Sequence, residues 1–176
     1  STGGFTDVLL RAGARSVVAV DVGYGQLAWP WRTDPRVVVI DRTNARDLTP
    51  ATVGLGGQLM DVVVGDLSFI SLTVVLPALA SVAADDADLV LMVKPQFEVG
   101  RARVGPGGVV RDPDLRAEAV REVAAAAWAL GLGSRGVVAS PLPGPAGNVE
   151  DFLLLCKGAP PLDEADLVRA VSEGPS

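Results

Sequence analysis

The chain of 176 residues is long enough for one domain with a substantial core, and 49% of its residues are apolar. It has no histidine, which excludes Ser-His-Asp catalysis and the common zinc sites, and no apolar run of the roughly 18–20 residues that a membrane span needs. The net charge of −6 argues against a nucleic-acid binder, although it is a poor guide to one local face.

The first third of the chain predicts a helix and then alternating elements. A glycine-rich turn at residues 1–4 opens a helix that Gly13 would stop. Strands are expected at residues 16–21, 36–41 and 60–66, and each ends in an aspartate. Helices are expected between them, at residues 44–53 and 70–84.

The rest of the chain continues the alternation. An apolar strand at residues 88–94 ends in Lys94, and a helix follows at residues 112–130 with a proline in its first turn. Strands at 134–140 and 151–157 flank a linker rich in proline and glycine. The lone cysteine, Cys156, lies in the last strand and indicates a buried thiol in a reducing compartment. Residues 162–173 predict a peripheral helix or a frayed tail.

Strands that are apolar throughout and alternate with helices predict a doubly wound α/β fold, with a parallel sheet covered on both faces. A glycine turn before the first helix normally follows a strand, so we expect that a first strand precedes Ser1 in the parent protein.

Lys94 is the most informative residue. The chain has two lysines, Lys94 and Lys157, against thirteen arginines, and Lys94 follows a buried strand directly. Ligands bind at the carboxyl ends of such strands, and lysine can take part in proton chemistry where arginine cannot. This placement predicts a chemical role.

Two acidic residues are expected near Lys94. Asp66 ends the neighbouring strand, so the two opposite charges would hold each other in place at adjacent strand ends. A buried structural ion pair is the alternative, although such pairs add little net stability. Glu150 opens the last strand and could complete the cluster, but on residue pattern alone an exposed acid at a strand start is favoured.

A nucleoside site is predicted in the first part of the chain. The Gly3-Gly4 turn offers free backbone N–H groups, and Asp21 ends the next strand, where acids bind ribose hydroxyls. A packing role for the glycines and a capping role for Asp21 are the alternatives. Thr43 or Asn44 would cap the following helix, which is at least as favoured for Asn44 as contact with adenine.

Five ordered motifs resemble the TlyA (hemolysin A) family, within the wider FtsJ/RrmJ-type ribose 2′-O-methyltransferases that use S-adenosyl-L-methionine (SAM). The resemblance covers about residues 1–157. The motifs are Ser1–Asp7, Asp66–Leu72, Lys94–Glu98, Gly108–Pro113 and Gly147–Glu150.

The resemblance implies a Rossmann-like methyltransferase fold over residues 1–158, mostly parallel with an antiparallel last strand, and a tail or short helix at 159–176. It implies a Lys–Asp–Lys–Glu tetrad whose last three members are Asp66, Lys94 and Glu150, and no metal. The first lysine, the first strand and an S4-like RNA-binding domain would lie before Ser1. This chain alone is therefore expected to bind RNA weakly or undetectably, and its inactivity is an open alternative. The residues implied to contact SAM are Ser1, Thr2, Gly3, Gly4, Phe5, Asp21, Val22, Thr43, Asn44, Asp66 and Leu67.

The implied reaction is methylation of ribose 2′-OH groups, in cytidines of ribosomal RNA in assembled subunits, in the cytoplasm. RNA would be contacted by Arg101, Arg103 and Arg111, with Phe97 stacking on a base, although a solvated loop is the alternative for each arginine. Phe69 is expected in the core.

Three other readings stay open at this point. A nicotinamide-binding Rossmann domain would share the glycine turn and Asp21, but it would leave Lys94, Asp66 and Glu150 unexplained. A membrane-active protein would fit the family's hemolysin name, yet no apolar span or basic amphipathic helix is seen. The chain could also be an inert scaffold.

Overall fold

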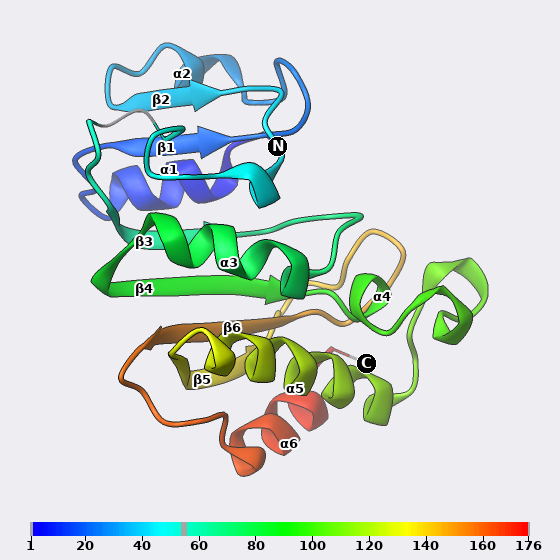
Figure 1. The fold of residues 1–176 in the computed structure, drawn as a ribbon. Helices are drawn as coiled ribbons and strands as arrows, with labels where there is room; N and C mark the ends of the chain where they lie inside the picture. The colour runs from blue at the N-terminus through cyan, green and yellow to red at the C-terminus, as the bar shows by residue number, and fades with distance from the viewer. Residues whose placement is uncertain (1, 54–55, 176) are drawn as a thin grey trace. The chain divides into compact units, whose positions relative to one another are not determined.

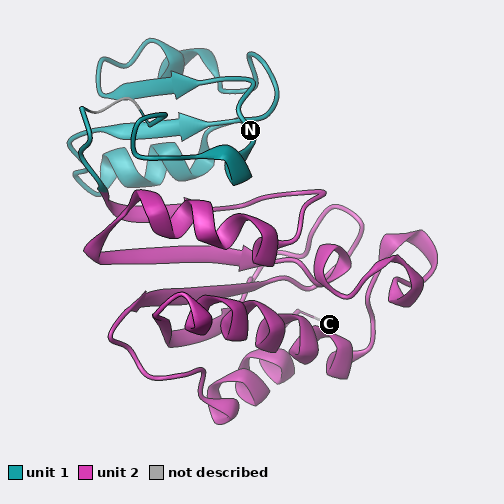
Figure 2. Cartoon of the chain, in the orientation of Figure 1, with its two compact units in different colours: residues 1–59 teal, residues 60–176 magenta. Residues whose placement is uncertain are grey.

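The computed structural model describes residues 2–53 and 56–175, and these form two compact units. Unit 1 is residues 1–59 and unit 2 is residues 60–176 (Figure 2). Each unit has its own sheet and helices, and each is described by itself below.

Unit 1 contains a two-stranded parallel sheet, in which β1 (Val17–Val20) pairs with β2 (Val37–Ile40) (Figure 1). Helix α1 (Gly4–Arg11) precedes β1, and Gly13 follows the helix with a φ of 96°, as the sequence predicts. The short helix α2 (Trp29–Arg32) lies between the strands in sequence.

The helix expected at residues 44–53 is wrong. Only a single 3-10 turn forms, η1 (Ala45–Asp47), and the chain is extended at Leu48. Pro50 disfavours helical backbone at the residue before it, and the side chains of Thr49 and Thr52 bond each other's backbone instead. Local side-chain bonding therefore replaces the helical hydrogen bonds.

Unit 2 contains a four-stranded sheet in the order β3-β4-β6-β5. β3 and β4 are parallel, and β6 is antiparallel to both of its neighbours, which confirms the expected α/β class with an antiparallel last strand. The elements are β3 (Met60–Gly65), α3 (Leu72–Val82), β4 (Ala83–Val93), α4 (Pro95–Glu98), η2 (Arg101–Arg103), η3 (Pro106–Gly108), α5 (Pro113–Ala129), β5 (Leu132–Ala139), β6 (Asp151–Lys157) and α6 (Glu164–Glu173).

The core of unit 2 lies between its sheet and helices α3 and α5. Leu89, Leu91, Leu153 and Leu155 alternate along β4 and β6 and are at most 1% exposed. Because alternate side chains of a strand share a face, these four leucines form one apolar surface. Helices α3 and α5 pack on each other and on the sheet (Figure 1). The packed core of the sheet and these two helices therefore fixes the positions of the carboxyl ends of β3 and β4.

The C-terminal helix α6 packs on α5 and β5, and Leu167 is fully buried. The chain leading into it runs against β5, where the Ser134 N–H donates to the carbonyl of Pro160 at 2.8 Å. A Cβ atom on Gly133 would overlap the carbonyl of Ala159, so glycine is required for this approach. The helix expected over 162–173 thus forms, and it is not frayed. Within residues 2–53 and 56–175, none of the helices has the length and apolar character for a membrane span.

Candidate functional site

Asp66 and Lys94 meet at the carboxyl ends of the parallel neighbours β3 and β4. Lys94 Nζ lies 2.6 Å from Asp66 Oδ1 and donates a hydrogen bond to Ser68 Oγ at 3.2 Å. The Lys94 side chain is 12% exposed, whereas that of Asp66 is 37% exposed. The predicted pairing of these two charges is confirmed. The ammonium group is fixed by two acceptors on the same segment, while the carboxylate is still reachable from solvent.

The other lysine has a different setting. Lys157 closes β6, is exposed, and forms an ion pair with Asp85 near the start of β4. Because β4 and β6 are antiparallel, this pair lies at the end of β4 opposite to Lys94.

Glu150 is buried, so the expectation of an exposed acid at the strand start is wrong. Its residue is 5% exposed, and Oε1 accepts a hydrogen bond from Gln96 Nε2 at 3.0 Å. The Glu150 carbonyl also accepts from the Ser140 N–H at 2.7 Å, and a Cβ on Gly144 would come within 2.8 Å of Oε1. The loop before β6 therefore folds over the carboxylate, and Gln96, two residues after Lys94, holds it.

Asn148 joins two loops of unit 2. Its Oδ1 accepts from the Val110 N–H at 2.9 Å, and its Nδ2 donates to the Gly108 carbonyl at 2.9 Å. The residue is 2% exposed. Since both polar groups of one amide are used, the glycine-rich loop before α5 is fixed to the loop that leads into Glu150.

Phe69 is 91% exposed and has a φ of 65°, so its expected place in the core is wrong. Its ring lies beside that of Phe97, with centroids 5.2 Å apart and planes tilted by 51°. Leu67, in the same segment, is half-buried. Exposed Phe69 and half-buried Phe97 thus lie on the two segments that follow β3 and β4 and that carry Asp66 and Lys94.

The three arginines implied to contact RNA are all exposed, but they differ in their partners. Arg103 forms an ion pair with Glu118 at 2.5 Å and donates to the Val99 carbonyl at 2.7 Å. Arg101 lies in the same 3-10 turn, and Arg111 directly precedes the N-cap of α5. Arg103 therefore has a structural function that the sequence did not reveal.

The glycine turn in unit 1 combines packing and an open helix end. Gly3 is the N-cap of α1 with a φ of 107°, and no side chain caps this helix. A Cβ on Gly3 would come within 2.6 Å of Trp31 Cδ1, so tight packing also requires glycine here. Phe5 is partly exposed, the Thr2 carbonyl accepts from the Ala28 N–H, and Ser1 lies outside the described residues.

Asp21 directly follows β1, and its Oδ1 accepts from the Gly23 N–H at 2.7 Å. Val22 beside it is 70% exposed. Thr43 N–H donates to the Asp21 carbonyl at 3.0 Å. Asn44 caps η1 by accepting from the Arg46 N–H, so its capping function is confirmed.

A fully buried carboxylate next to Glu150 escaped the sequence analysis. Asp151 is 0% exposed, and neither of its oxygens has a hydrogen-bond partner among the described residues. Burial raises the pKa of Asp151 to about 6, although the charge of Arg116 on α5 opposes this. Its position in a strand of apolar residues was the available signal.

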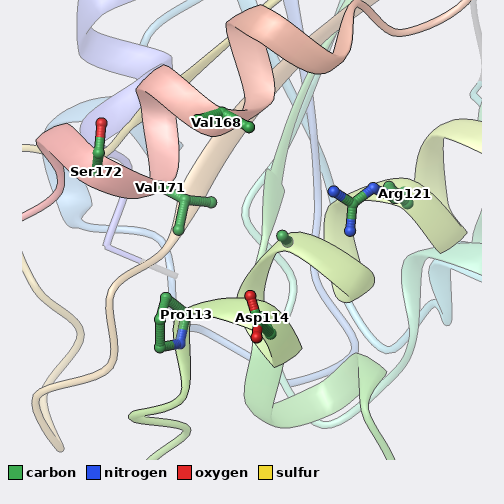
Figure 3. Close-up of a pocket in the computed structure, with 7 residues that line it drawn as sticks. Pro113, Asp114, Arg121, Val168, Val171 and Ser172 are labelled. Atoms are coloured by element: carbon green, nitrogen blue, oxygen red, sulfur yellow. The ribbon is translucent and has the colours of Figure 1, made fainter.

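An open cavity of about 270 Å³ lies between α5 and α6 (Figure 3). None of the candidate site residues described above lines it. It is lined by Pro113 and Val168 among others, and by Arg121, whose guanidinium is paired with Glu164. The cavity is a packing seam between two helices. In the described part of the chain, no group of three or more carboxylate, histidine or cysteine side chains is arranged to hold a metal ion.

Comparison with known proteins places these residues in a family context. The model of the FtsJ-like methyltransferase family matches residues 1–157. The 16S/23S rRNA (cytidine-2′-O)-methyltransferase TlyA of Mycobacterium tuberculosis is 62% identical over 181 residues, which cover 99% of this chain and 66% of that protein. The chain thus spans slightly less than two thirds of the length of this relative.

Two solved structures were also compared. A protein from Lactococcus lactis described as a hemolysin superposes with a TM-score of 0.91 at 39% identity, over 98% of this chain and 83% of its own. The N-methyltransferase NodS from Bradyrhizobium japonicum has a TM-score of 0.59 at 11% identity, over 89% of this chain and 82% of its own, and shares the fold alone.

Proposed function

Since this chain belongs to the FtsJ-like methyltransferase family, we propose that it serves SAM-dependent methyl transfer to the ribose 2′-OH of ribosomal RNA. The pairing of Lys94 with Asp66 at adjacent strand ends supports this function most directly. The name of the mycobacterial relative supports cytidine as the nucleotide and 16S and 23S ribosomal RNA as the substrate. We assign the activity to ribosomal subunits in the cytoplasm. The family match favours SAM over a nicotinamide cofactor.

The chemical problem is the weak nucleophilicity of a ribose hydroxyl. Lys94 would orient the 2′-OH and, after releasing its own proton to solvent, accept the hydroxyl proton as the oxygen forms its bond to the methyl group, while Asp66 and Ser68 keep the amine in one position. Glu150, buried and held by Gln96, would add a second fixed negative charge. Most of the rate would come from holding hydroxyl and methyl donor in line, because correct positioning alone can lower a barrier by about 7–11 kcal/mol.

The residues of the chain fit SAM as a cofactor. In unit 1, the free N–H groups at the uncapped N-terminus of α1 would donate hydrogen bonds to acceptor groups of SAM. Asp21 would bind the ribose hydroxyls, and exposed Val22 would cover an apolar face of adenine. Thr43 and Asn44 would line the same site, and Asn44 also caps η1 through its Oδ1. SAM, when bound, supplies an electrophilic methyl group.

RNA would be bound by charge and by stacking. Phe97, together with its exposed neighbour Phe69, offers an aromatic surface for a base, and such stacking contributes about 1–3 kcal/mol per base. Arg101 and Arg111 would contact phosphates. With a net charge of −6, the chain alone would bind weakly, and we assign most of the affinity to an S4-like domain preceding Ser1 in the parent protein.

A pair of lysine substitutions tests the function in the parent protein. Lys94→Ala should lower methyl transfer to ribosomal RNA by at least about 10³-fold, while the SAM affinity measured by calorimetry changes less than about threefold. Lys157→Ala removes the other lysine and should keep wild-type activity. Methylation that survives Lys94→Ala would exclude the proposed role.

A further inference from the structure

The N-terminus of α3 is capped by a side chain from another element. Glu98, the last residue of α4, accepts a hydrogen bond from the Leu72 N–H at 2.8 Å and from Ser71 Oγ at 2.6 Å. Ser71 is the N-cap residue and itself accepts from the Thr73 N–H at 3.1 Å. One carboxylate therefore holds both the capping hydroxyl and the first free amide of the helix.

The two segments joined by Glu98 are those that carry the paired charges. Residues 66–71 connect β3 to α3 and start with Asp66, whereas α4 begins directly after Lys94. The first end of segment 66–71 is held by Lys94, through Asp66 and Ser68. Its second end is held by Glu98. Both anchors come from the short stretch of chain that follows β4.

The segment between these anchors contains a strained residue. Phe69 has a φ of 65°, which costs a non-glycine residue roughly 1–2 kcal/mol. Phe69 is almost fully exposed, so core packing does not supply this energy. The hydrogen bonds at the two ends, together with the contact between the Phe69 and Phe97 rings, keep the segment in this conformation.

We propose that Glu98 is a positioning residue for methyl transfer: bonded to Leu72 and Ser71, it fixes the conformation of residues 66–71 and so holds Asp66 against Lys94. Its catalytic consequence rests on the proposed function. Burial raises the pKa of Glu98, and Glu122 on α5 adds to this, but the Leu72 N–H and the Ser71 hydroxyl oppose the increase. The positive end of α3 also favours a negative charge at this position.

Hydrogen exchange tests the positioning without any need for activity. In Glu98→Ala, the amides of residues 67–73 should exchange at least about tenfold faster, since opening of the segment loses its second anchor. Glu98→Gln keeps an acceptor for the Leu72 N–H and should stay within about threefold of wild type. Asp163→Ala removes the capping side chain of α6 and should affect that helix alone. Unchanged exchange of residues 67–73 in Glu98→Ala would overturn the proposal.

Kinetics in the parent protein separate positioning from simple helix capping. Glu98→Ala should lower kcat about 10–100-fold with KM for SAM and RNA within about threefold, because a misplacement near 1 Å costs about 10²-fold. Glu98→Gln should recover most of kcat, and Asp163→Ala should keep all of it. A wild-type kcat in Glu98→Ala would overturn the proposal. If Glu98→Ala does not fold, Ser71→Ala removes the hydroxyl contact with Glu98 and the cap on the Thr73 N–H but leaves the bond between Glu98 and the Leu72 N–H. It should lower kcat by a smaller factor than Glu98→Ala. If the wild-type protein itself shows no methyl transfer, the proposed function is refuted. The amide exchange of residues 67–73 would still show whether Glu98 holds the segment.

Discussion

Gln96 donates a hydrogen bond to Glu150 across 54 positions of sequence, with Nε2 and Oε1 at 3.0 Å. Gln96 lies in the helical turn that follows Lys94, and Glu150 directly precedes β6. The other polar atom of this amide, Oε1, is buried without a hydrogen-bond partner among the described residues. The Gln96 amide thus uses its donor, Nε2, on Glu150, while its acceptor, Oε1, makes no hydrogen bond within the described residues.

We expect this contact to matter for activity. Gln96→Met removes the donor with little change in volume and should lower kcat about 10–100-fold, because a buried carboxylate would lose its fixed orientation. Glu150→Gln should cost at least as much. The double variant should be no worse than Glu150→Gln alone, since both changes act through one contact. Additive losses, measured as initial rates of methyl transfer in the parent protein, would contradict this link.

The buried carboxylate of Asp151 predicts a pH-dependent stability. Its folded pKa of about 6 is raised above the ordinary aspartate value of 3.8, so its contribution is most favourable below about pH 4 and is lost as pH rises through about 6. The two-unit shift corresponds to about 3 kcal/mol.

Asp151→Asn cannot ionise, so its stability relative to wild type should increase by up to about 3 kcal/mol between about pH 4 and pH 8. Urea unfolding of both proteins across this range measures the difference. An Asn variant that follows the wild-type pH curve would show that Asp151 ionises in the folded state as easily as in the unfolded state.

The contact of Gly133 with the chain before α6 predicts a local cost for a methyl group. Gly133→Ala would push the backbone of Ala159 and Pro160 away and should destabilise the protein by about 1–3 kcal/mol, with faster amide exchange in α6. Gly4→Ala is a suitable control, since a Cβ there meets nothing within 4 Å. Its stability should stay the same or rise by about 0.5–1 kcal/mol.

The arginines predict a division between RNA contact and structure. Arg101→Ala and Arg111→Ala should each reduce the slope of log affinity against log salt by about 1 for ribosomal RNA. Arg103→Ala loses the ion pair with Glu118 and the hydrogen bond to the Val99 carbonyl. It should therefore lower the free energy of unfolding and leave the salt slope nearly unchanged. Arg135→Ala breaks an exposed pair with Asp88 in the middle of β4 and serves as control. Equal slopes for all four variants would exclude the proposed RNA contacts.

The strands could be predicted from the sequence because most of them are short apolar runs that end in a charged residue. The last strand was predicted at residues 151–157 and is observed as Asp151–Lys157. The placement of Lys94 beside Asp66 followed from the same logic, since the carboxyl ends of parallel neighbours meet at one edge.

The failures came from contacts distant in sequence or from side chains that compete with the backbone. Glu150 was expected to be exposed because a sequence does not show that residues 140–144 fold over it. The capping of α3 by Glu98 spans 26 positions, and the four-residue α4 is too short for a periodic signal. Phe69 was assigned to the core by residue type, yet its backbone adopts a conformation that turns the ring to solvent.

The scarcity of lysine gives the chain an unusual chemical simplicity. The sequence has only two side-chain amines. The Lys94 side chain is 12% exposed and follows β4, whereas the Lys157 side chain is 44% exposed and pairs with Asp85 near the start of β4. A mild acylating or reductively methylating reagent would therefore modify two resolvable side-chain positions, which mass spectrometry can count separately. The reactivity of one amine becomes an internal reference for the other, so occupancy around Lys94 can be followed on unaltered protein by the ratio of two labelled peptides.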